Sequence, residues 1–240
     1  MQSPLAAVYF DCDSTLSAIE GVDELLESAD PALRAEIAAM TEQAMNGERP
    51  LADVYELRLA RLAPNRRQLE RIGHRYVERL VPDAPGVVRA LRWLGKHVGV
   101  VSGGLLAPVQ HVARHLGVPL ENVHAVPVTF AADGSYVDFD RRSPLWRNQG
   151  KVTVLRALPP AHHPLAFVGD GVTDLETRPH VARFVGFGGV VARPAVRAGA
   201  EHFVAGPGLA GVLPLVLTEH EVGRLRGEPD FTSLLSAAEA

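Results

Sequence analysis

The 240-residue chain is poor in cysteine, in basic charge and in long apolar runs, and each shortage excludes a class of protein. A single cysteine rules out an internal disulfide, so the chain is not a disulfide-stabilised scaffold. No apolar run approaches the roughly 18 residues of a membrane-spanning helix, and the apolar stretch at 211–218 is far too short. Lysine and arginine total 24 against 28 aspartates and glutamates, the opposite of a nucleic-acid binder's balance.

The N-terminal segment also lacks the basic region that opens a secretory signal, and it meets a charge at Asp11. We therefore expect a cytoplasmic protein that acts neither on nucleic acid nor at a membrane. Its composition, 47% hydrophobic and 22% charged, is that of an ordinary globular protein with enough apolar residues for a sizeable core.

Four short apolar runs, each followed by Gly, Asp or Ser, indicate buried strands. They are rich in Val and Phe and do not alternate with polar residues, which is typical of parallel strands; they cover residues 6–10, 98–101, 165–168 and 183–187. Helical patterns lie between them, at 85–95, 107–116 and 151–158. This alternation predicts a doubly wound, mostly parallel α/β sheet with a Rossmann-like core, whose ligands bind beyond the carboxyl ends of the strands.

Residues 18–82 interrupt the alternation. Helical patterns fill this stretch: one opens at Asp30-Pro31 and stops near Gly47, and others cover 51–62 and 66–80. We predict a helical-bundle cap over residues 18–82, inserted after the first strand of a catalytic core formed by residues 1–17 and 83–240.

Two features beyond the core are weaker signals. Residues 126–130 and 136–139 flank a turn-rich segment and predict a small hairpin. The last fifteen residues are polar, and we expect them to be peripheral.

Four carboxylates follow two of the predicted strands. Asp11 and Asp13 come after the first, and one of such a pair can attack as a nucleophile while the other moves a proton. Asp170 and Asp174 follow the third predicted strand. Each pair alone could be an ordinary polar turn, but four carboxylates at one sheet edge repel one another and require a cation. Oxygen ligands without nearby Cys or His ligands favour Mg²⁺ over Zn²⁺.

Other polar residues suggest an anion site, with alternatives for each. Ser102 and the glycines after it follow the second strand and could form either an anion-binding nest or a simple turn. Lys151 opens a helix, where a positive charge is unfavourable unless an anion lies beside it. Arg58 lies in the apolar stripe of a helix, where it could either form a structural ion pair or bind an anionic group of a substrate. Glu20 is either a first-turn residue or a site residue.

In this order, the motifs Asp11-x-Asp13-x-Thr15, Ser102-Gly103-Gly104, Lys151 and GDGVTD resemble those of the haloacid dehalogenase-like hydrolases. Longer stretches, among them DCDSTLSAIEGVDELLE and VVSGGLLAPVQHVARHLGVP, resemble the phosphoserine phosphatases of that superfamily. The resemblance runs from about residue 6 to about residue 205.

For the reaction, the resemblance implies Mg²⁺-dependent hydrolysis of O-phospho-L-serine, the last step of phosphorylated serine biosynthesis. Asp11 would become an aspartyl phosphate, and Asp13 would protonate the leaving oxygen and then deprotonate water. Mg²⁺ would bind the Asp11 carboxylate, the Asp13 backbone carbonyl and Asp170, with Asp174 in support.

For binding, the resemblance assigns the phosphoryl group to Ser102, Gly103 and Lys151. Glu20 would face the substrate ammonium group, and Arg58 would hold its carboxylate. The helical insertion would close over this small-molecule substrate, and the protein would be a monomer or a homodimer.

Two alternatives stay open. The same chemistry could serve another small phosphomonoester, such as a sugar phosphate, and phosphothreonine differs by one methyl group, worth only about 1–3 kcal/mol of discrimination. A non-catalytic phosphoacceptor module also uses strand-end carboxylates and Mg²⁺, although Asp13 and the cap-sized insertion disfavour it. Thr173 stands where many relatives carry Asn, a departure from the family's pattern.

Overall fold

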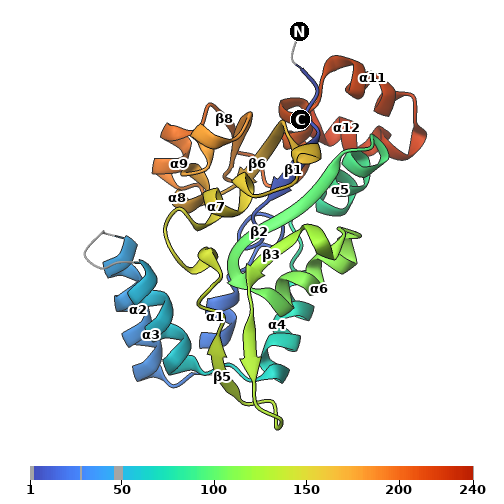
Figure 1. Cartoon of the computed structure of the whole chain (residues 1–240). Coiled ribbons are helices and arrows are strands. Elements are labelled where there is room, and N and C mark those ends of the chain that lie inside the picture. The colour runs from blue at the N-terminus through green and yellow to red at the C-terminus, as the bar shows by residue number, and fades with distance from the viewer. Residues whose placement is uncertain (1–2, 28, 46–50, 240) are drawn as a thin grey trace.

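The centre of the molecule is a six-stranded sheet with the strand order β3-β2-β1-β6-β7-β8 (Figure 1). The computed structural model describes residues 3–27, 29–45 and 51–239. All neighbouring strands in the sheet pair in parallel. The strands are β1 (Ala7–Phe10), β2 (His97–Leu105), β3 (Val123–Val126), β6 (Leu165–Gly169), β7 (Arg183–Phe187) and β8 (His202–Val204). This is the Rossmann order, and it confirms the predicted fold class.

The four predicted strands are β1, β2, β6 and β7, whereas β3 and β8 were not anticipated. Both missed strands lie at the edges of the sheet. They are also short, with four and three residues. Each also contains a histidine, in VHAV and in HFV, so neither offers the uninterrupted apolar run that marks β1.

Alternate residues of the central strand enter two cores, one on each face of the sheet. Val8 and Phe10 belong to the core beneath α5 (Ala84–Trp93) and α6 (Leu106–Leu116). Ala7 and Tyr9 belong to the opposite core, with residues of α7 (Gly150–Arg156) and α9 (Pro194–Gly199). Because side chains of a strand alternate between faces, an all-apolar strand requires this two-sided cover.

Between β1 and β2 the chain forms α1 (Gly21–Leu26), α2 (Pro31–Met45), α3 (Leu51–Leu62) and α4 (Arg66–Glu78). The first is an addition to the prediction, and its six residues are too short to show a helical period. Asn65 and Gln68 form a capping box that fixes the start of α4. The expected stop at Gly47 lies outside the described residues.

The inserted helices begin and end side by side. Ser17 bridges to Leu80, the amide of Ala18 donates to the carbonyl of Arg79, and the amide of Val81 donates to that of Leu16. From this point α4 packs along α6, while Tyr55 and Leu59 of α3 join the core on the other face of the sheet. The insertion therefore contacts both halves of the molecule around the carboxyl ends of the strands.

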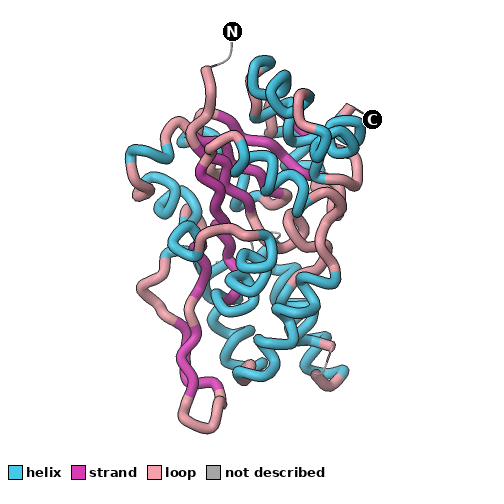
Figure 2. Tube along the Cα trace, turned by 90° about the vertical axis from the view of Figure 1, so that its right-hand side faces the viewer, coloured by secondary structure: helices cyan, strands magenta, loops and turns pink. Residues whose placement is uncertain are grey.

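The predicted hairpin consists of β4 (Val128–Phe130) and β5 (Tyr136–Phe139), which pair antiparallel. It projects from the body of the molecule (Figure 2). Its first arm begins later than predicted, because Val126 ends β3 of the main sheet. Pro127 separates the two strands, and proline has no amide to continue a ladder.

The expectation that the last fifteen residues are peripheral is wrong. After β8 the chain forms α10 (Leu213–Val216), α11 (Glu219–Arg226) and α12 (Thr232–Ala238). Phe231, Leu234 and Leu235 are buried in the same core as α5. The polar average of the segment concealed three apolar side chains on one side. Within the described residues, no helix combines the length and apolarity required to cross a bilayer.

Candidate active site

The predicted site residues meet where the strand order reverses, between β1 and β6. Asp11 follows β1 and Asp170 follows β6, and these strands are neighbours in the sheet. Their carboxyl ends open into a pocket of about 250 Å³. All the residues singled out from the sequence line it: Asp11, Asp13, Glu20, Arg58, Ser102, Gly103, Lys151, Asp170 and Asp174. The switch point of an open α/β sheet is the usual position of a ligand site.

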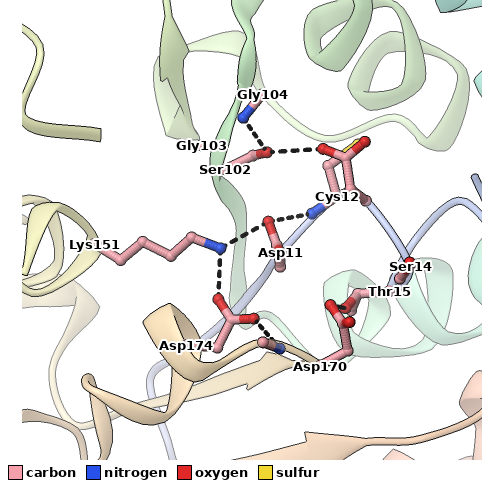
Figure 3. A network of polar contacts seen from close by, with 12 residues as sticks. Asp11, Cys12, Ser14, Thr15, Ser102, Gly103, Gly104, Lys151, Asp170 and Asp174 are labelled. Atoms are coloured by element: carbon pink, nitrogen blue, oxygen red, sulfur yellow. Dashed lines mark hydrogen bonds and ion pairs between the residues drawn. The ribbon is translucent and has the colours of Figure 1, made fainter. Parts of the chain in front are cut away.

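Lys151 reaches between two carboxylates (Figure 3). Its Nζ lies 2.9 Å from Asp11 Oδ1 and 2.5 Å from Asp174 Oδ1. Asp11 Oδ1 also accepts the amide of Cys12 at 2.7 Å, and Asp174 Oδ2 accepts the amide of Gly171 at 2.8 Å. These contacts fix both carboxylates, and both of those to Asp11 fall on Oδ1.

The position of Lys151 follows from local backbone geometry. Gln149, just before α7, has a φ of 60°, and a Cβ on Gly150 would overlap the carbonyl of Pro144. The helix therefore starts tightly against the preceding turn, and its first-turn lysine points into the site. Burial acts to lower the pKa of Lys151, but the charges of Asp11 and Asp174 outweigh it and raise the pKa above its ordinary value.

The acidic cluster fits a hard divalent cation. Asp11, Asp170 and Asp174 each offer a carboxylate oxygen, and these oxygens lie within 4.8 Å of one another. Burial, followed by the charges of Asp174 and Asp11, raises the pKa of Asp170 to about 8. A carboxylate in that environment is stabilised by a cation, and oxygen donors alone are the ligand set of Mg²⁺.

Asp13 is surrounded by donors from the insertion. Its Oδ1 accepts the Tyr76 hydroxyl at 2.5 Å and the Gly21 amide at 2.7 Å. Its Oδ2 lies 3.5 Å from the Ser102 hydroxyl. Burial, and then the charges of Glu20 and Asp11, raise the pKa of Asp13 above its ordinary value. A carboxyl group with a raised pKa can carry a proton near neutral pH, as a general acid must.

The Ser102–Gly104 segment lies within β2, whereas the sequence analysis placed it after the strand. The pairing with β3 shifts register between Val101 and Leu105, so the segment forms an irregularity of the strand. The amide of Gly104 donates to Ser102 Oγ at 2.9 Å, and the Gly103 carbonyl accepts the Tyr55 hydroxyl at 3.0 Å. All three residues of the segment line the pocket.

Glu20 and Arg58 enter the same pocket from the insertion. Glu20 accepts the Ser14 hydroxyl at 2.6 Å. The Arg58 guanidinium lies 5.9 Å from the centre of the Tyr55 ring. Burial lowers the pKa of Arg58, against the opposing effects of Tyr55 and Glu20, and burial raises the pKa of Glu20. The pair presents opposite charges to whatever the pocket holds.

Three further residues of the pocket were not predicted. Arg193 contacts Asp170 at 3.1 Å and Glu20 at 3.7 Å, from the loop after β7. Tyr55 and Tyr76 reach the site from α3 and α4. In the sequence, both tyrosines lie at apolar positions of their helices, and Arg193 belongs to none of the motifs; the signal nearest to Arg193 is the glycine-rich stretch at residues 186–189.

Comparison with known proteins agrees with this geometry. The family model of the haloacid dehalogenase-like hydrolases matches residues 8–177. The phosphoserine phosphatase of Mus musculus is 36% identical over 200 residues, covering 82% of this chain and 88% of the mouse protein. The human phosphoserine phosphatase is 34% identical over the same shares of the two chains.

A solved structure supports the fold. The phosphoserine phosphohydrolase-like protein of Francisella tularensis superimposes with a TM-score of 0.73 at 24% identity, covering 84% of this chain and 96% of its own. Together, the family match over most of the chain, the close relatives and the strand-end carboxylates establish one point: the chain belongs to the haloacid dehalogenase-like hydrolase family.

Proposed function

We propose that the protein is a Mg²⁺-dependent phosphatase that hydrolyses O-phospho-L-serine through an aspartyl phosphate on Asp11. The observation that carries the proposal is the content of one pocket: a strand-end carboxylate beside a buried lysine, an acid with a raised pKa, and an acid–arginine pair of opposite charge. The names of the curated relatives support the substrate.

In the first step, Asp11 Oδ2 attacks phosphorus and forms the new O–P bond. The bond from phosphorus to the serine oxygen breaks, and the Asp13 carboxyl proton moves to that oxygen, so that L-serine leaves neutral at its hydroxyl. Lys151, the Ser102 hydroxyl and the Gly103 amide hold the phosphoryl oxygens, which distributes their charge and aligns the attack.

In the second step, water attacks the aspartyl phosphate. The Asp13 carboxylate accepts a proton from that water as its oxygen bonds to phosphorus. The Asp11–phosphorus bond breaks, which restores the Asp11 carboxylate and releases inorganic phosphate. Asp13 then holds the proton needed for the next cycle.

The groups that would hold Mg²⁺ are the carboxylates of Asp11 and Asp170 and the backbone carbonyl of Asp13. Asp174 supports them through its contacts with Lys151 and Gly171. When bound, Mg²⁺ supplies positive charge that offsets the clustered carboxylates and the phosphoryl group.

The insertion supplies selectivity in this proposal. Glu20 faces the substrate ammonium group and Arg58 its carboxylate, which suits a zwitterionic amino acid. Residues 18–82 act as a cap that excludes bulk water from the core formed by residues 1–17 and 83–240, hinged where Ser17 meets Leu80. The enzyme then completes serine biosynthesis in the cytoplasm.

The test is phosphate release from a panel of small phosphomonoesters with Mg²⁺, for the wild type and Asp11→Asn. We expect phosphoserine to be preferred and the Asp11 variant to be inactive. Arg58→Ala should raise KM for phosphoserine at least tenfold but leave p-nitrophenyl phosphate little changed. Arg61→Ala is the matched control, because Arg61 lies on the same helix but pairs with Glu36 at the surface.

Two outcomes would redirect the proposal. A preference for a phosphate without an amino-acid head would retain the hydrolase chemistry and remove the roles of Glu20 and Arg58. A long-lived phosphoprotein after acetyl-phosphate treatment, without turnover, would indicate a phosphoacceptor module instead.

A further inference from the structure

We propose that Tyr76 is a positioning residue that orients the Asp13 carboxyl group, so that its proton-carrying oxygen, Oδ2, faces the phosphate-binding strand. The inference rests on the proposed function, in which Asp13 transfers protons. It adds to that function a residue from the inserted helix α4, which the motifs at the strand ends do not include.

The two carboxyl oxygens of Asp13 have different hydrogen-bond partners. Tyr76 Oη at 2.5 Å and the Gly21 amide at 2.7 Å both approach Oδ1. An oxygen that accepts two hydrogen bonds in this way has no direction left for a proton of its own. The transferable proton is therefore placed on Oδ2, which lies 3.5 Å from Ser102 Oγ on β2.

Two glycines make space for this arrangement around Asp13. A Cβ at Gly21 would overlap Tyr76 Oη, so the hydroxyl reaches Asp13 only because residue 21 is glycine. On the other side, a Cβ at Gly104 would come within 2.9 Å of Asp13 Oδ2. Two glycines from distant segments thus make space for the tyrosine hydroxyl and for the second oxygen of the carboxyl group.

Tyr76 itself is held rigidly. Its side chain is 1% exposed and packs in the main core with Leu69 and Ile72 of the same helix. From this buried position its hydroxyl donates to Asp13 Oδ1. A fixed donor reduces the number of carboxyl orientations that compete with the productive one.

The test compares Tyr76→Phe with Tyr9→Phe. Each change removes one buried hydroxyl with one hydrogen bond, but Tyr9 Oη contacts His162 at 2.7 Å and does not line the pocket. The substrates are phosphoserine, whose alkoxide needs a proton on leaving, and p-nitrophenyl phosphate, whose phenolate leaves without one.

For Tyr76→Phe we expect kcat on phosphoserine to fall about tenfold, a part of the roughly 10²–10⁴-fold that positioned acid–base catalysis contributes. KM should stay within about twofold, and the rapid first turnover of p-nitrophenyl phosphate, followed as the burst of p-nitrophenolate, should keep its rate. Tyr9→Phe should leave all three quantities unchanged. An equal loss with both substrates would mean a merely structural role and would overturn the inference, as would an unchanged kcat on phosphoserine.

Gly21→Ala gives a second reading that keeps the tyrosine. The added methyl group displaces the hydroxyl, so the same selective loss on phosphoserine is expected, and full activity in this variant would count against the inference. Asp13→Asn distinguishes a failure of the positioning role of Tyr76 from a failure of the proposed mechanism. If Asp13→Asn is inactive while Tyr76→Phe is normal, the positioning role alone fails; if Asp13→Asn is active, the proposed mechanism fails first.

Discussion

At the scale of single residues, the charge balance of the site depends on Lys151. Its ammonium group is the cation nearest to two buried carboxylates, and it is itself buried. A buried ion pair adds little by itself to stability, but removing one partner leaves the other charge without compensation. The residue therefore contributes both to the stability of the fold and to holding Asp11 in place.

Replacement of Lys151 by Met should lower the free energy of unfolding by about 3–5 kcal/mol, as breaking a buried pair does, and should abolish phosphate release. Urea unfolding and the phosphate assay measure the two effects. Lys96→Met is the matched control, because Lys96 Nζ pairs with Glu221 at 2.6 Å, outside the pocket. The control should lose stability and keep its activity per folded molecule; full activity of Lys151→Met would contradict the assignment.

Asp170 should show the opposite relation between stability and function. Because its folded-state pKa is raised to about 8, the ionised carboxylate lowers the stability of the metal-free protein as pH rises from about 4 toward 8. Asp170→Asn should therefore melt at a higher temperature than the wild type in EDTA at pH 7.5. Mg²⁺ should raise the melting temperature of the wild type but not of the variant, since a ligand stabilises only the state that binds it.

Asp140→Asn is the control for that experiment, because Asp140 pairs with Arg142 at the surface. It should respond to Mg²⁺ as the wild type does. If Mg²⁺ stabilised Asp170→Asn as much as it stabilises the wild type, Asp170 would not be a metal ligand.

At the scale of elements, the amino ends of the strands gather histidines. The His97 ring at the start of β2 stacks on His162 with centroids 4.1 Å apart, and His124 lies on β3. Burial lowers the pKa of His162 and of His124, and neighbouring histidines lower them further. The fold therefore favours the neutral form of both rings.

When the pKa of a histidine is lower in the folded state than its unfolded value of about 6.5, the neutral ring contributes stability at pH values above about 6.5. This stability is lost as the pH falls through the folded-state pKa, because the unfolded chain binds the proton more readily. Lowering the pH from 7.5 to 5.5 should therefore reduce the melting temperature of the wild type relative to that of His162→Gln, because only the wild type takes up a proton at this ring on unfolding. The exposed His220→Gln is the control and should follow the wild type. Equal pH dependence of His162→Gln and the wild type would mean that this ring does not titrate on unfolding.

At the scale of the whole molecule, the C-terminal segment completes the core. Phe231 is 3% exposed and packs edge-on against Trp93 of α5, with ring centroids 5.8 Å apart. Gly86, also on α5, faces Leu234 of α12. The segment thus covers the outer side of a helix that itself covers the sheet, although it lies far from the pocket.

Phe231→Ala should lower the free energy of unfolding by about 3–5 kcal/mol, the cost of a cavity left by a buried aromatic residue. Activity at low temperature should persist, because the pocket is formed by other elements. Ser233→Ala, at an exposed position two residues further along the chain, is the control. Urea unfolding by circular dichroism measures both variants, and a loss below about 1 kcal/mol for Phe231→Ala would show that the segment is peripheral, as the sequence had suggested.

Much of the architecture and the main carboxylates could be predicted from the chain, because their signals are local. A buried strand is a short apolar run, and the residue after it lies at the carboxyl edge of the sheet. The sequence therefore predicts that Asp11 and Asp170 share one edge, and the pairing of β1 with β6 makes their strands neighbours. The helices of the insertion were read from their period, apart from the short α1.

Contacts between distant segments were decided only by the tertiary structure. Tyr76, Tyr55 and Arg193 lie outside the motifs that indicate the site, and each reaches it because packing brings its element there. The burial of Phe231 likewise depends on a partner helix more than a hundred residues earlier in the chain. The local sequence pattern determines whether a segment forms a helix or a strand. Which of these elements come into contact depends on the free energy of packing the whole chain. The surroundings of Asp13, which combine residues from distant segments, were therefore decided by the tertiary structure.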